Sequence, residues 1–228
     1  MNRHADERLP LSINAARVLE RQHRSTNVLT LLPAEEREQV ERELSEREVA
    51  TTTQEVKLAV FDASTFTGLR TIVYDAAIER IDDEGERSIE LPKLAELVAS
   101  AVVARCLRPE RLRGSEIRAI RRVMKLTLSE LAKRLDDKTA VETVSRWESE
   151  AQPMGVYAEK ILRLLVCEGL RRDAPGIEYN ASKILDLRIR DPWKINSDHE
   201  YPAVELELMS MKQSPGLIIE AWSQKRAA

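Results

Sequence analysis

The sequence has few aromatic residues, few cysteines and no long apolar run. Aromatic side chains make up 4% of the 228 residues, so any core must be built mostly from Leu, Ile, Val and Ala. Cys106 and Cys167 lie far apart and form no CxxC pair, which argues against a disulfide framework and a cysteine-based zinc site. We expect both cysteines to be half-buried apolar side chains, with redox sensing as an alternative.

The sequence also lacks targeting and membrane signals. Its first ten residues lead into no apolar segment, and the longest apolar run, 97–104, is far too short to span a bilayer. We therefore expect a cytoplasmic protein that makes no membrane contact.

Catalytic and metal-binding motifs are missing as well. There is no glycine-rich phosphate loop, no GxSxG and no HExxH. The three histidines, His4, His23 and His199, are scattered and have no second ligand at a useful spacing, so we predict surface histidines and no metal site. We predict no enzymatic activity and no cofactor.

Charged residues, in contrast, are abundant and unevenly distributed. They make up 33% of the chain, whose formal net charge is −3. Residues 1–104 carry a net charge of −7, residues 105–172 of +6 and residues 173–228 of −2. Because DNA attracts clustered cations, the basic middle is the segment expected to approach it, although chance variation of local charge is an alternative.

Composition and periodicity divide the chain into four parts. Residues 1–55 predict a charged helical arm, either docked on the body or solvated. Residues 56–108 contain segments rich in Val, Ile and Thr and a helix after Pro92, which predict a small antiparallel sheet plus helix for dimerisation or partner binding. Residues 109–170 predict a helix-turn-helix DNA-binding domain, and residues 171–228 a C-terminal helix and strand extension.

The C-terminal part contains two expected strands. In AVELELMSM, Val204, Leu206 and Leu208 alternate with polar positions, which predicts a half-buried strand, and GLIIEAW predicts another. The two strands could pair with each other, extend the first sheet or pair across a dimer. The fold class expected from all four parts is α+β, mainly helical.

Cap signals divide residues 114–170 into four short helices. Ser115 is expected to cap the first. Thr127 and Glu130 have the spacing of a capping box, in which the threonine accepts the N3 amide proton and the glutamate reaches back. Thr139 and Glu142 repeat this spacing at the third helix. Two short capped helices with a tight polar connection are typical of a helix-turn-helix, whose second helix enters the major groove.

Helical spacing sorts the residues of this expected recognition helix. Its inward side is predicted to consist of Ala140, Val144, Trp147 and Glu148. Outward, Arg146 could make two parallel hydrogen bonds to guanine, and Glu142 could accept one from cytosine. The alternative for Arg146 is a solvated side chain or an ion pair with Glu142 or Glu150.

Short hydroxyl side chains and lysines complete the expected interface, because both suit phosphate oxygens. The predicted DNA-binding residues are Lys125, Ser129, Lys133, Lys138, Thr139, Glu142, Thr143, Ser145 and Arg146. Four further arginines form a basic connector that is expected to be a solvated linker, or alternatively to follow the DNA backbone or enter the minor groove: Arg105, Arg108, Arg111 and Arg113.

The segment LRGSEIRAIRRVMKLTLSELAKRL, followed by ETVSRWES and a proline, resembles the lambda-repressor/Cro-type (XRE) helix-turn-helix superfamily. Over about residues 89–166 it is similar, more narrowly, to the DNA-binding domain of MqsA-type antitoxin regulators. The resemblance implies a DNA-binding domain. The chain departs from that family because it has no zinc-binding CxxC pairs, has Leu128 in place of a DNA-contacting glutamine, and has a longer connection before the recognition helix.

These features together predict a sequence-specific transcriptional regulator that binds double-stranded DNA, with repression by promoter occlusion as its simplest action. A homodimer on a palindromic operator is expected, because one short recognition helix reads too few base pairs. One alternative is an antitoxin that neutralises a partner protein through residues 1–104 or 173–228. Another is a regulator that senses a ligand through residues 56–104.

Overall fold

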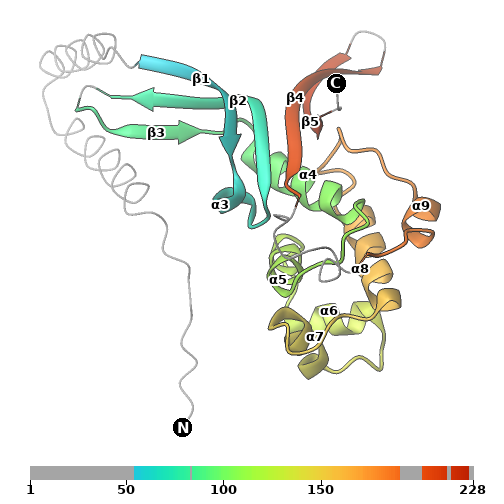
Figure 1. Ribbon diagram of the computed structural model, residues 1–228. Helices are drawn as coiled ribbons and strands as arrows, with labels where there is room; N and C mark the ends of the chain where they lie inside the picture. The colour runs from blue at the N-terminus through green and yellow to red at the C-terminus, as the bar shows by residue number, and fades with distance from the viewer. Residues whose placement is uncertain (1–53, 83, 191–201, 215–216, 226–228) are drawn as a thin grey trace, which may run out of the picture. The chain divides into compact units, whose positions relative to one another are not determined.

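The computed structural model describes residues 54–82, 84–190, 202–214 and 217–225 (Figure 1). Residues 54–81 and 85–228 belong to one compact unit, and the description below concerns that unit. The expected helical arm over 1–55 lies almost entirely outside the described residues.

The first half of the unit is a three-stranded antiparallel sheet, as the sequence predicts. Strand β1 (Gln54–Asp62) pairs with β2 (Thr71–Ile81), and β3 (Arg87–Glu90) pairs with the second half of β2. Asp75 interrupts β2 with a φ of 47°, where the register between β1 and β2 shifts. Such a bulge bends the strand and increases its local twist.

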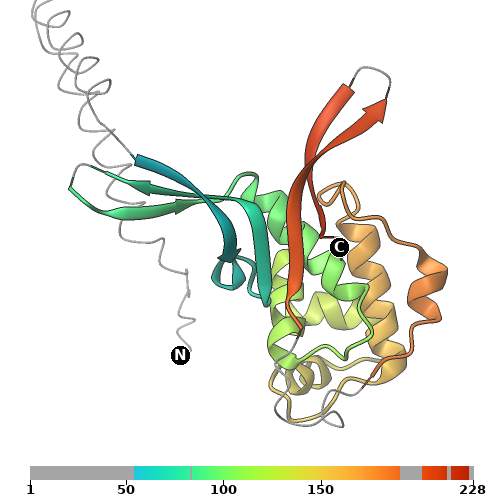
Figure 2. The same cartoon turned by 45° about the horizontal axis from the view of Figure 1, so that its top comes forward.

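The C-terminal strands complete this sheet. Strands β4 (Val204–Ser214) and β5 (Leu217–Gln224) form an antiparallel hairpin, and β4 also pairs in parallel with the first half of β2, from Thr71↔Val204 to Tyr74↔Glu207. The strand order is β1-β2-β4-β5, with β3 on the other half of β2 (Figures 1 and 2). Two of the three arrangements expected for the C-terminal strands therefore occur together.

The expectation of a mainly helical fold is wrong. About 40% of the described residues are helical and 27% lie in strands, and the strands form one five-stranded mixed sheet. The expected flanks share this sheet instead of forming separate extensions of a helical domain. Sequence periodicity identifies single strands but not a parallel pairing between segments more than 100 residues apart.

Helix α4 (Leu94–Cys106) connects the sheet to the other helices. It packs against both β4 and β5 as well as against α5 and α8. Trp222 of β5 is fully buried against it: its backbone N–H donates to Glu96 Oε1 (2.9 Å) and its indole N–H to the carbonyl of Pro92 (3.2 Å). α4 is consequently buried on nearly every side, which explains its continuous apolar sequence.

The remaining helices are α3 (Ser64–Thr67), α5 (Gly114–Val123), α6 (Leu128–Leu135), α7 (Val141–Glu148), α8 (Val156–Gly169) and α9 (Ala181–Leu185). α9, of five residues, lies where the sequence predicts a helix in the C-terminal extension. Four helices therefore lie within 114–170, where the cap signals predict four.

Both cysteines are fully buried, so the expectation of half-burial is wrong. Burial raises the pKa of Cys106 to about 11 and also raises the pKa of Cys167. A thiol needs its thiolate form to react, so both are packed as inert apolar groups at neutral pH.

This burial gives a first testable prediction. In the native protein at pH 8, neither thiol should react with Ellman's reagent, whereas both should react in urea. Because the folded state retains the Cys106 proton that the unfolded chain releases, stability should be lost as pH rises from about 9 to about 11. The exposed control Ser182→Cys should add one rapidly reacting thiol, and rapid reaction of the wild type would contradict the burial.

Candidate nucleic-acid interface

Helices α5 to α8 share one apolar core that holds α7 in place. Ile117, Ile120, Leu131, Val144 and Leu162 are each at most 1% exposed. α7 packs against both α5 and α6, so its inner side is fixed by two helices.

The caps of these helices agree only partly with the sequence prediction. The Thr127–Glu130 box forms as expected: Thr127 Oγ1 accepts from the Glu130 amide (3.2 Å), and Glu130 Oε2 accepts from the Thr127 amide (2.7 Å). Ser115 does not cap α5, because Arg113 occupies the N-cap and its amide donates to Glu116 Oε2 (2.8 Å).

The second predicted box, at Thr139 and Glu142, does not form. Ala140 is the N-cap of α7, no side chain caps the helix, and Ala140 is exposed rather than inward. The helix begins one residue later than the Thr139 spacing requires. Glu142 is therefore exposed in the first turn of α7 without a capping role.

An ion cluster fastens the C-terminal end of α7 to α5. The Glu148 carboxylate, 4% exposed, accepts from Arg121 Nε (2.6 Å) and Nη2 (3.0 Å), and Arg118 Nε lies 3.4 Å away. Arg121 also donates to the carbonyl of Leu126 (2.9 Å), at the turn before α6. The hydrogen bonds with Glu148 raise the pKa of Arg121 above its ordinary value. This cluster fixes the position of the C-terminal end of α7 relative to α5.

The outer face of α7 is polar and exposed. Val144 and Trp147 are buried as predicted, whereas Glu142, Ser145 and Arg146 are exposed and Thr143 is half-buried. Among the described residues, the Arg146 guanidinium has no ion pair and no hydrogen bond. Glu150, the expected alternative partner, accepts instead from the amide of Gly114 (2.9 Å).

The other predicted residues surround α7 at the surface. Lys125, Ser129, Lys133 and Lys138 are exposed, and Thr139 is half-buried. Lys125 lies in the turn between α5 and α6 with a φ of 55°. Within the described ranges, none of these three lysines forms an ion pair, so their charges are available to an anionic partner.

The basic connector 108–113 is not a solvated linker. Two buried ion pairs hold it in place: Arg105 with Glu116 (2.6 Å), and Arg163 with Glu159 (2.7 Å). Both arginines also donate to the carbonyl of Glu110, at 3.0 and 2.7 Å. Sequence reasoning missed both glutamates, although the i,i+4 spacing of Glu159 and Arg163 was a usable signal.

The remaining connector arginines differ in their environments. Arg108 donates to the carbonyl of Pro202 (3.2 Å), and desolvation lowers its pKa. Arg111 donates to the carbonyl of Met154, and Arg113 is exposed. Arg105 is only 2% exposed, so a minor-groove role for it is excluded.

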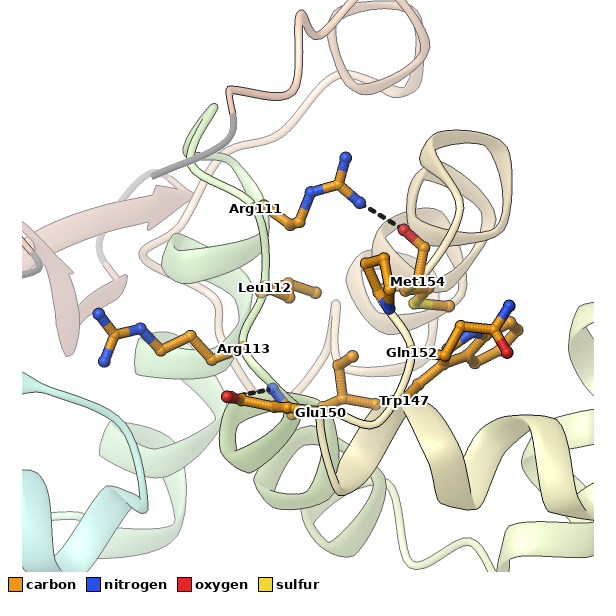
Figure 3. A pocket seen from close by; sticks show the side chains of 10 residues that line it. Arg111, Leu112, Arg113, Trp147, Glu150, Gln152 and Met154 are labelled. Carbon is orange, nitrogen blue, oxygen red and sulfur yellow. Dashed lines mark hydrogen bonds between the residues drawn. The ribbon is translucent and has the colours of Figure 1, made fainter. Parts of the chain in front are cut away.

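A pocket of about 390 Å³ lies behind α7, between the connector, α5 and the loop before α8. Figure 3 shows Arg111 directed at the Met154 carbonyl and Glu150 directed at the Gly114 amide. Arg111 and Glu150 thus have partners in the protein, whereas the buried indole N–H of Trp147, which also lines the pocket, has no hydrogen-bond partner among the described residues.

Comparison of the chain with protein families, with curated proteins and with solved structures found no match. Within the residues described, no group of three or more His, Cys, Asp or Glu side chains is placed to hold a metal ion. No helix in the described ranges combines the length and hydrophobicity needed to cross a bilayer.

Proposed function

We propose that the protein is a sequence-specific regulator of transcription that binds double-stranded DNA through α7. The observation that carries the proposal is Arg146, an exposed guanidinium with no ion-pair partner among the described residues, on a helix whose opposite side is fixed by Trp147 and by the Glu148–Arg121 pair. A fixed helix with an unpaired arginine suits the bidentate recognition of guanine.

The neighbouring exposed side chains support the same function. Glu142 can accept from a cytosine amino group, and Thr139, Thr143 and Ser145 can donate to phosphate oxygens. Lysines on both sides of α6 can neutralise phosphates along the groove rim. Two copies on a palindromic operator would supply the specificity that one short helix lacks, and repression would follow from occlusion of the polymerase.

The proposal is tested by DNA binding of wild type and Arg146→Ala, first to DNA upstream of the gene and then to a randomised pool. Arg146→Ala should weaken specific binding by about 1–3 kcal/mol and relax sequence preference at one position per half-site, with little change in non-specific binding. Fluorescence anisotropy across a salt series measures both quantities.

The matched control is Arg188→Ala, which removes an exposed arginine outside α5–α8 and should bind like wild type. If no sequence in the pool is enriched, or if both variants lose affinity equally, α7 does not read bases and the proposal fails.

A protein-binding function, such as that of an antitoxin, is the second candidate. Exposed apolar side chains on the strands favour it: Val56, Val60, Met209 and Ile218 are between 45% and 63% exposed. Co-expression with the products of adjacent genes, followed by size-exclusion chromatography, tests it. A stable complex that Val60→Lys disrupts would support this function.

A further inference from the structure

A second cavity, of about 630 Å³, opens between α4, the end of α5 and the segment after α8. Its apolar wall is formed by Val98 and Ala99 of α4, Val123 of α5 and Leu170 after α8. Ala99 and Leu170 are buried, and the two valines are half-buried. The cavity lies within the size range of small-molecule sites.

Three cations surround this apolar wall. Arg122, Lys125 and Arg172 all line the cavity, and all three are exposed. In the part of the chain that the structure describes, none of the three side chains forms an ion pair or a hydrogen bond. Arg122 and Lys125 are three positions apart at the end of α5, and Arg172 lies in the segment after α8, so the fold brings Arg172 to the other two.

The cavity contains two carboxylates, of which one is already engaged. Glu96 Oε1 accepts from the amide of Trp222 (2.9 Å), and its Oε2 lies 3.8 Å from Lys93 Nζ. Asp173 is the other carboxylate. Among the described residues, Asp173 has no side-chain hydrogen bond or ion pair, so three cations lie beside one carboxylate that is not already engaged, which leaves the mouth of the cavity positive.

We propose that this cavity binds a small amphipathic organic anion, with its apolar body against Val98, Val123 and Leu170 and its carboxylate among Arg122, Lys125 and Arg172. Burial of the apolar body supplies the affinity, and the cations select the charged head over an uncharged analogue. Of the residues that form the apolar wall and the cationic mouth, only Lys125 also has a role in the proposed DNA interface.

Lys125 links this cavity to the candidate DNA interface. It lies in the turn before α6 and is also one of the residues predicted to contact phosphate. A bound anion would therefore compete with DNA for its charge. This consequence rests on the proposed function, whereas the binding of the anion does not.

The test uses octanoate as the probe and octanol as its uncharged analogue, with the whole 228-residue chain and no DNA. Isothermal titration calorimetry should detect saturable binding of octanoate and at least tenfold weaker binding of octanol. Arg172→Gln should weaken octanoate binding by about fivefold, which corresponds to one partly exposed charge contact. Arg171→Gln, which alters the adjacent exposed arginine outside the cavity, should have no effect.

A second variant fills the cavity. Ala95 is exposed and lines the cavity, so Ala95→Phe can occupy its space without repacking the core, and it should abolish octanoate binding while thermal unfolding remains as in wild type. The proposal is overturned if octanoate does not bind, if octanol binds equally well, or if Arg172→Gln and Ala95→Phe bind octanoate like wild type. None of these outcomes depends on whether the protein binds DNA.

Discussion

Replacing Arg163 by methionine is expected to lower the free energy of unfolding by about 3–5 kcal/mol, because it leaves Glu159 as a buried charge without its main partner. Both side chains are completely buried, and Arg163 Nη2 lies 2.7 Å from Glu159 Oε1. Arg163 also donates to the carbonyls of Cys106 (2.8 Å) and Glu110 (2.7 Å), which would lose a donor. Urea denaturation at pH 7 measures the effect.

Two further variants separate the ion pair from general packing. Arg171→Met changes an exposed arginine of the same region and should alter stability by less than about 0.5 kcal/mol. The double variant Glu159→Leu/Arg163→Met should recover part of the loss, because no uncompensated charge remains inside. A loss below about 1 kcal/mol for Arg163→Met alone would show that the pair does not hold the connector.

Gly114→Ala is expected to destabilise the protein by about 3 kcal/mol and to displace α7. A Cβ at this position would lie 2.6 Å from the carbonyl oxygens of both Trp147 and Glu148, which are backbone atoms that cannot rotate away. Overpacking of this kind forces the backbone to move, and the part that must move is the end of the proposed recognition helix. The free energy of unfolding, measured by chemical denaturation, and the affinity for specific DNA should both decrease.

Gly155→Ala is the matched control for this glycine. A Cβ at Gly155 meets no atom within 4 Å, so the substitution should change stability by at most about 0.5 kcal/mol. If Gly114→Ala is as stable as Gly155→Ala, the close approach of α5 to the end of α7 is not present in solution.

Local features of the fold were predictable from sequence because their causes are local. The Thr127–Glu130 box forms where the spacing places it, and Val144 and Trp147 are buried as helical periodicity requires. The Thr139–Glu142 box failed because two residues of the correct type and spacing do not determine where the chain enters the helix. Cap motifs therefore identify a helix more reliably than its first residue.

The mixed sheet and the buried arginines were not predictable for a different reason. The pairing of β4 with β2 is set by tertiary contacts, and AVELELMSM gives no sign of its partner. Arg105 reads as part of a basic linker, yet it is 2% exposed because Glu116, eleven positions later, meets it with two hydrogen bonds. Burial of a charge depends on a partner that composition does not identify.

The placement of β4 has a consequence for how the protein is made. Residues 204–224 supply the inner strand β4 and the buried Trp222. They leave the ribosome after every other described helix and strand. Until then β2 keeps an unpaired edge over Thr71–Tyr74, and an open strand edge is a template for aggregation. A chain interrupted by a premature stop codon in this region would therefore be exposed to quality-control proteases, even though all of α5–α8 had been synthesised.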